Sequence, residues 1–160
     1  MSELLMISLM QSRVPTPCVG LCSTTYGDSV CRGCKRFAHE IVDWNRYDDL
    51  QKTAVLRRLG ELTSSVVNRY VVVVDASRLR EMLETHGLRY HKYQPPECWV
   101  YDLFRQTGGR FANLSDLGLV KLPEAESLTN GDIWERIQSE LLAISEAHYE
   151  RYFRQPLEFD

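Results

Sequence analysis

The chain has 160 residues, 44% of them hydrophobic, and a formal net charge of −3. A chain of this size and composition can bury a hydrophobic core, so it need not be disordered. The small negative charge gives no overall basic field, which argues against non-specific nucleic-acid binding by the whole chain. The charge is uneven, because residues 1–70 hold nine Lys and Arg against seven Asp and Glu, whereas residues 71–160 hold ten against fifteen. We therefore expect any anionic partner to meet the first half.

Residues 1–13 are expected to form a tail rather than a signal peptide. The segment is mildly apolar, but it carries the acidic Glu3 near its start and lacks a basic region and a small-residue cleavage site. No apolar run in the sequence approaches the ~20 residues that a membrane span needs. The sequence thus predicts a cytoplasmic protein without membrane contact, in which thiols stay reduced.

Four of the five cysteines crowd into one short segment with the spacing C-x3-C-x8-C-x2-C. They are Cys18, Cys22, Cys31 and Cys34. In a reducing compartment such crowding indicates metal ligation rather than disulfide bonds. Two short pairs joined by a turn can bring four thiolates to one ion, and glycines between them give the backbone the freedom that tight loops need. The spacing therefore predicts a metal centre, and four protein ligands leave no open position for a catalytic zinc.

The metal itself stays open on spacing alone, between one Zn²⁺ and one iron-sulfur cluster. The second pair, Cys31 and Cys34, is typical of a zinc knuckle that leads into a helix, yet thiolates also hold iron-sulfur clusters. The three basic residues Arg32, Lys35 and Arg36 flank this pair. They would either compensate the negative charge of a tetrathiolate site or contact an anionic partner such as nucleic acid.

These residues resemble a known family. The run Pro17 to Cys22, the knuckle from Cys31 to Cys34, Trp44 and the helical pattern of residues 48–58 are similar to a short bacterial family of unknown function, described as predicted iron-sulfur proteins and YdhL-like. The resemblance covers residues 14–60 and implies a metal centre at the four clustered cysteines. It implies no catalytic residue, and residues 66–160 lie outside it.

Two helices are expected to pack on the metal centre and to complete a domain of residues 14–65. The first would begin directly after Cys34, because apolar residues then recur with helical spacing. These residues are Phe37, Ile41 and Trp44. The second would begin after Asp48, which has Gln51 in the capping-box position.

Residues 66–160 are expected to form a small α/β domain, which makes the whole chain a mostly helical α+β protein. The expected elements are a buried strand at 70–74, a helix capped by Asp75 or Ser77 and ended by Gly87, a strand at 88–93, a helix at 97–106, a short helix or loop at 113–122, and a long helix from Asp132 to Tyr152 with Glu135 in capping-box position. The isolated Cys98 is expected to be a small core residue.

No nucleophile motif or phosphate-binding glycine loop accompanies the cysteines. We therefore expect a non-catalytic adaptor that binds a protein partner through a domain built on a tetracysteine centre. An iron-sulfur redox or sensor component is the first alternative. A nucleic-acid adaptor that uses Arg32, Lys35 and Arg36 is the second, and the overall charge disfavours it.

Overall fold

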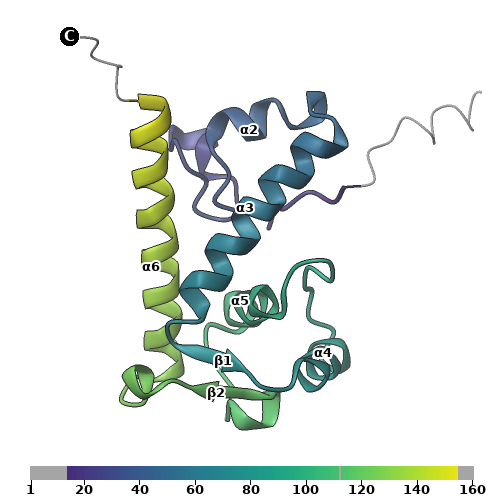
Figure 1. Cartoon of the computed structure of the whole chain (residues 1–160), viewed down its shortest axis with the longest axis vertical. Helices are drawn as coiled ribbons and strands as arrows, with labels where there is room; N and C mark the ends of the chain where they lie inside the picture. Colours follow the sequence, from purple (N-terminus) through teal and green to yellow (C-terminus); the bar gives the residue numbers. More distant parts are fainter. Residues whose placement is uncertain (1–13, 112, 155–160) are drawn as a thin grey trace, which may run out of the picture. The chain divides into compact units, whose positions relative to one another are not determined.

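The computed structural model describes residues 14–111 and 113–154, so the predicted tail of residues 1–13 lies outside the described part (Figure 1). The chain folds as two compact units that divide between Arg58 and Leu59. It is mostly helical, with a small sheet and a long C-terminal helix, which confirms the predicted α+β class. Among the described residues, no helix is both long enough and apolar enough to cross a bilayer.

The first unit contains short elements and the start of a long helix. In chain order they are the 3-10 turn η1 (Ser23–Tyr26), helix α2 (Ala38–Val42), the 3-10 turn η2 (Trp44–Arg46) and the first part of helix α3 (Asp49–Val67). The prediction that a helix begins directly after Cys34 is wrong. An isolated β-bridge between Val30 and Phe37 keeps the intervening chain extended and looped, so α2 begins only at Ala38.

Helix α3 begins as the capping-box pattern predicts. The backbone N–H of Gln51 donates to Asp48 Oδ1 at 2.8 Å, and the backbone N–H of Asp48 donates to Gln51 Oε1 at 2.9 Å. The helix runs from the first unit into the second, and the predicted domain boundary after residue 65 falls within it.

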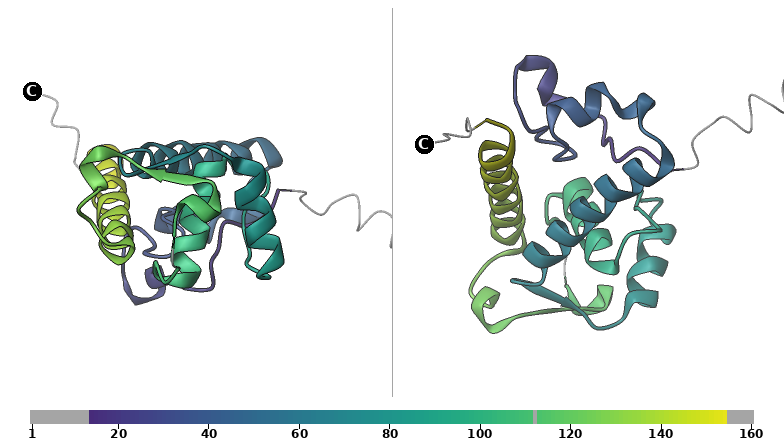
Figure 2. Two further views of the ribbon diagram at one scale, coloured as in Figure 1. Left: turned by 90° about the horizontal axis from the view of Figure 1, so that it is seen from below. Right: turned by 45° about the horizontal axis from the view of Figure 1, so that its top comes forward.

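The second unit contains the end of helix α3, a two-stranded antiparallel sheet and the three helices α4, α5 and α6. Its elements after α3 are β1 (Val71–Val73), α4 (Ala76–Thr85), α5 (Pro96–Thr107), the 3-10 turn η3 (Ser115–Leu117), β2 (Leu119–Lys121), the 3-10 turn η4 (Pro123–Ala125), α6 (Asn130–Tyr149) and the π-helical turn η5 (Glu150–Arg154). Helices α4 and α6 lie on opposite sides of α5 (Figures 1 and 2). Leucine, isoleucine, valine and phenylalanine side chains of these elements form one core around Phe104, which is fully buried.

The sheet differs from the prediction in its second strand. Residues 88–93 form no strand but a loop, and the partner of β1 is β2, which sequence patterning assigned to a short helix or loop. In this register Val72 lies opposite Val120, and both side chains are exposed, at 37% and 48%. The expected buried strand is therefore half-buried, because the core covers only one face of the sheet.

Helix ends in the second unit follow local capping chemistry. Asp75, one of the two caps that the sequence left open, is the one that caps α4, since its Oδ1 accepts the backbone N–H of Arg78 at 3.1 Å. Helix α6 begins earlier than predicted, because Thr129 caps it. The Thr129 hydroxyl accepts the backbone N–H of Asp132, and the Asp132 carboxylate accepts the backbone N–H of Thr129, both at 3.1 Å. Asp132 is thus the acidic partner of a capping box and not its first residue.

Candidate metal centre

The backbone of the second cysteine pair packs closely against that of the first at Gly33. A methyl group on Gly33 would lie 2.6 Å from the carbonyl oxygen of Leu21 and 2.8 Å from Cγ2 of Val19, so only glycine lets the two segments approach this closely. Beside this contact, the backbone N–H of Arg32 donates to the Ser23 hydroxyl at 2.8 Å. The eight-residue spacer therefore returns the backbone of the second pair to that of the first.

The second cysteine pair lies in a tight turn that ends in a left-handed residue. The backbone N–H of Lys35 donates to the Cys31 carbonyl at 2.8 Å, and that of Cys31 donates to the Arg36 carbonyl at 2.9 Å. Lys35 closes the turn with φ of 65°, a conformation that costs a non-glycine residue roughly 1–2 kcal/mol. Its ammonium group donates to the carbonyls of Arg32 and Gly33, which supports the turn from within.

The sulfurs of the first pair make hydrogen bonds with neighbouring groups. The backbone N–H of Gly20 donates to Cys18 Sγ at 3.4 Å, and the Thr24 hydroxyl lies 3.2 Å from Cys22 Sγ. The Thr24 and Thr25 hydroxyls lower the pKa of the Cys22 thiol below its ordinary value. Donors that point at sulfur favour the thiolate, which is the form that binds metal.

The sulfurs of the second pair lie in a similar but more buried environment. Burial raises the pKa of the Cys31 thiol, but backbone N–H groups of Cys34, Ser23 and Gly33 outweigh burial and lower it. Burial raises the pKa of the Cys34 thiol, although the Arg36 guanidinium opposes this by donating from Nε to Cys34 Sγ at 3.3 Å. Charge and hydrogen bonds thus gather around both sulfurs.

The structure does not show the predicted four-cysteine knot itself. All five cysteines are free thiols, with Cys18 exposed, Cys22 and Cys34 half-buried, and Cys31 and Cys98 buried. In the part of the chain that the structure describes, no group of three or more His, Cys, Asp or Glu side chains is arranged to hold a metal ion. Metal binding by these four cysteines therefore remains a prediction, with a donor set and local hydrogen bonds that fit it.

The three flanking basic residues are not equivalent. Arg32 has a side chain that is 63% exposed and pairs with Asp28 at 3.3 Å. Lys35 and Arg36 are each only 5% exposed. Burial lowers the pKa of the Lys35 ammonium to about 8, although the charges of Cys34 and Cys31 oppose this. The prediction of a three-residue contact with an anionic partner needs correction, because only Arg32 is available at the surface.

Sequence reasoning missed a network of buried charges that holds the helices of the first unit. Glu40 is 4% exposed and accepts hydrogen bonds from both terminal guanidinium nitrogens of Arg58 at 2.6 Å, as well as from the backbone N–H of Phe37 at 2.8 Å. Arg58 also stacks on the Phe37 ring at 4.3 Å. The ring of Trp44 packs in a similar way against two cations. These cations are Arg36, at 4.9 Å, and Lys52, at 5.5 Å.

The first unit is thus a small cysteine-rich module held together by the Glu40–Arg58 ion pair and by cation-aromatic contacts. Residues 16–63 match the family model described as "Protein of unknown function (DUF1289)". The match supports the resemblance to an uncharacterised family and does not confirm the iron-sulfur description. Searches of curated proteins and of solved structures gave no match.

Proposed function

We propose that residues 14–58 bind one metal centre through Cys18, Cys22, Cys31 and Cys34, and that the protein is a non-catalytic cytoplasmic adaptor for a protein partner. The observation that carries this proposal is the set of polar contacts around the four sulfurs. N–H groups donate to Cys18 and Cys34, the Thr24 hydroxyl lies beside Cys22, and backbone groups lower the pKa of Cys31, whose thiol also donates to the Leu21 carbonyl at 3.2 Å. Thiols that only fill a core need no such donors, whereas metal-bound thiolates are stabilised by them.

The buried cations of the turn add a second argument. A tetrathiolate site around Zn²⁺ carries two net negative charges, and a buried negative site needs nearby compensation. Arg36 is buried and donates to Cys34 Sγ, and the Lys35 ammonium is buried in the same turn. Their placement fits a role in neutralising the centre, which is one of the two roles that the sequence left open.

The bound group is either one Zn²⁺ or one iron-sulfur cluster. Zinc would supply structural cross-linking, and a cluster would supply one-electron redox chemistry. The N–H donors described above suit both, since hydrogen bonds to thiolate sulfur tune either centre. The iron-sulfur redox or sensor function therefore stands as the alternative to the adaptor function.

Exposed apolar residues favour an adaptor over a purely structural module. Leu21 lies within the first cysteine pair and is 55% exposed, and Tyr26, at the end of η1, is 89% exposed. On α2, Val42 is 79% exposed. Large apolar side chains held at the surface by a rigid turn are typical of protein contacts.

The test is anaerobic purification of the full chain followed by elemental analysis and visible spectroscopy. A colourless protein with one zinc per chain selects the zinc adaptor, and a brown protein with iron and sulfide that dithionite bleaches selects the cluster. Cys31→Ser should lose most of the metal, whereas the matched control Cys98→Ser should keep it, because Cys98 lies in the other unit. The proposal fails if the wild-type protein holds no stoichiometric metal, or if both variants lose it equally.

A further inference from the structure

The loop between α4 and α5 is unusually rich in basic and aromatic residues. Residues 86–95 contain one arginine, one lysine, two histidines and two tyrosines, and no acidic residue. At its centre is the run Arg89-Tyr90-His91-Lys92-Tyr93. Arg89 and Lys92 are exposed, and Tyr93 is 93% exposed.

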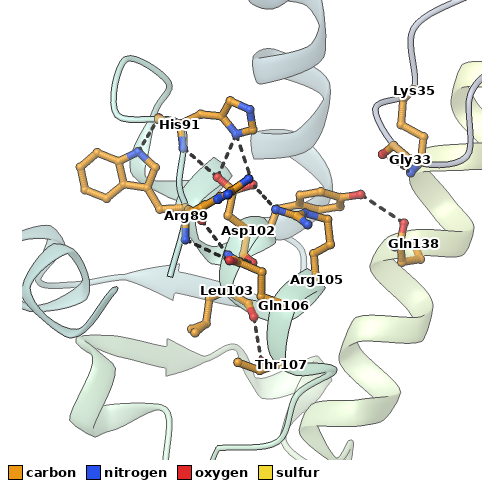
Figure 3. A network of polar contacts seen from close by, with 12 residues as sticks. Gly33, Lys35, Arg89, His91, Asp102, Leu103, Arg105, Gln106, Thr107 and Gln138 are labelled. Atoms are coloured by element: carbon orange, nitrogen blue, oxygen red, sulfur yellow. Dashed lines mark hydrogen bonds and ion pairs between the residues drawn. The ribbon is translucent and has the colours of Figure 1, made fainter. Parts of the chain in front are cut away.

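Side chains of α5 make hydrogen bonds to the backbone of this loop (Figure 3). Gln106 accepts the backbone N–H of Arg89 at 2.9 Å and donates to the Arg89 carbonyl at 2.6 Å. Asp102 accepts the backbone N–H of His91 at 2.9 Å, and the indole N–H of Trp99 donates to the His91 carbonyl at 2.9 Å. Because the backbone is fixed at two residues, the exposed side chains between and beside them are presented with little remaining backbone freedom.

The nearest buried carboxylate does not cancel the positive charge of the loop. Asp102 has a side chain that is 2% exposed, and its Oδ2 lies 3.0 Å from Nδ1 of His91. The hydrogen bond from Asp102 raises the pKa of the His91 imidazole, although burial opposes this. The guanidinium of Arg105 lies 4.0 Å from the same carboxylate. Asp102 is therefore engaged by His91 of the loop and by Arg105 of α5, so the positive charge that the loop presents is that of Arg89 and Lys92.

The aromatic rings of the loop stack with cations in a continuous series. Arg80 lies over the Trp99 ring at 5.0 Å, the Tyr90 ring meets Trp99 edge-on at 5.3 Å, and the Lys92 ammonium lies over Tyr90 at 5.8 Å. The hydroxyl of Tyr90 donates to Glu84 at 2.5 Å, which engages a neighbouring acid of α4. The loop thus offers cations and flat rings together on one surface.

Helices α4 and α5, which flank the loop, carry four Asp and Glu against three Arg, a smaller negative balance than that of α6. Helix α6 carries four Asp and Glu and one Arg. It lies on the far side of α5 from α4 (Figures 1 and 2). The overall negative charge of residues 71–160 therefore does not describe the α4–α5 loop.

We propose that the α4–α5 loop binds single-stranded nucleic acid. Arg89 and Lys92 would contact backbone phosphates, and the exposed ring of Tyr93 would stack on a base. A partner that presents anionic groups beside flat aromatic rings fits both features, whereas an acidic peptide or an anionic surface would use only the cations. This site lies outside the cysteine-rich unit and does not depend on the metal centre.

The test is fluorescence anisotropy of the full chain with a labelled oligothymidylate of about 12 residues, a length that spans the site of a typical single-strand binder. Tyr93→Ala should weaken binding roughly tenfold, the effect of losing one stacked base. The double variant Arg89→Gln with Lys92→Gln should lower the slope of log K against log salt by roughly 0.7 for each phosphate that is no longer neutralised. Tyr26→Ala and Arg32→Gln replace a similarly exposed tyrosine and arginine in the first unit and should leave binding unchanged.

Three results would overturn the proposal. The first is no binding at a low ionic strength of about 50 mM, at which single-strand binders bind more tightly than at physiological salt. The second is a loss of affinity in the Tyr26 and Arg32 variants with none in the loop variants. The third is binding of heparin or an acidic peptide as tight as that of the oligonucleotide and insensitive to Tyr93→Ala, which would indicate a general anion contact. Circular dichroism of each variant checks that the substituted surface residues leave the fold intact.

Discussion

Replacing Glu40 should destabilise the first unit more than replacing any surface charge in it. Its side chain is 6% exposed, and it accepts two hydrogen bonds from Arg58 and one from the backbone of Phe37. Removing one partner of a buried ion pair costs roughly 3–5 kcal/mol, and because Arg58 is 33% exposed and can regain water, Glu40→Ala should cost about 3 kcal/mol. The destabilisation comes from an unpaired guanidinium and an unsatisfied N–H group at the start of α2.

Hydrogen exchange measured by mass spectrometry can localise this destabilisation. A cost of about 3 kcal/mol corresponds to roughly hundredfold faster exchange in peptides that cover residues 37–46, with little change in peptides that cover α5. Asp43→Asn is the matched control in the same unit. Asp43 pairs with Arg46 at 3.9 Å between Oδ1 and a guanidinium nitrogen, and the Arg46 side chain is 86% exposed. Such a pair contributes less than about 1 kcal/mol. The reasoning is refuted if Glu40→Ala exchanges no faster than Asp43→Asn.

Three further predictions concern thiols, packing and pH. The native protein should leave Cys98 unmodified by iodoacetamide at neutral pH, because burial raises the pKa of this thiol to about 12; labelling of Cys98 before unfolding, seen by peptide mass spectrometry, would contradict this. Gly33→Ala should force the cysteine segments apart, which should destabilise the first unit by roughly 1–3 kcal/mol. Its thermal stability and its metal content should both fall. Gly131→Ala, which meets nothing closer than 3.8 Å, should be neutral or stabilising, and equal effects of the two variants would argue against the close approach at Gly33. The hydrogen bond to Asp102 raises the pKa of His91 above its ordinary 6.5. The stability that His91 adds relative to His91→Gln should therefore be fully present below about pH 6.5 and should disappear as the pH rises through the folded-state pKa. Urea unfolding of both proteins across this range measures the difference, and a difference that grows with pH would contradict the prediction.

Elements whose ends depend on local chemistry were predictable from the sequence. The capping box of Asp48 and Gln51 and the cap at Asp75 both lie where the pattern placed them. The predicted start of helix α6 was too late, because Asp132 is a residue type that often caps helices. Thr129, three residues earlier, also has a side-chain oxygen that can cap, and its backbone is extended, as is typical of a helix N-cap. A search for a Ser or Thr three residues before Asp132 would have found this start.

Features that depend on distant parts of the chain were not predictable in this way. Residues 88–93 alternate as a strand does, but side chains from α5 hold their backbone in place of a neighbouring strand. The burial of Lys35 and Arg36 was missed for a similar reason. Charged residues are ordinarily exposed. Nothing in the sequence around these two shows that Arg36 lies against Trp44 and the Cys34 sulfur, or that the Lys35 ammonium bonds the carbonyls of its own turn.

The small sheet leaves the protein open to misassembly. In the described part of the chain β1 and β2 pair only with each other, so each has an outer edge able to receive another strand. The exposed side chains of Val72 and Val120 add an apolar surface beside these edges. The ammonium group of the neighbouring Lys121 donates a hydrogen bond to the carbonyl of Leu128 at 2.7 Å. A lysine that in many proteins acts as a gatekeeper against fibril growth is here committed to an internal bond. When the second unit is warmed or partly unfolded, we therefore expect its strands to associate between molecules rather than the chain to remain a monomeric unfolded coil.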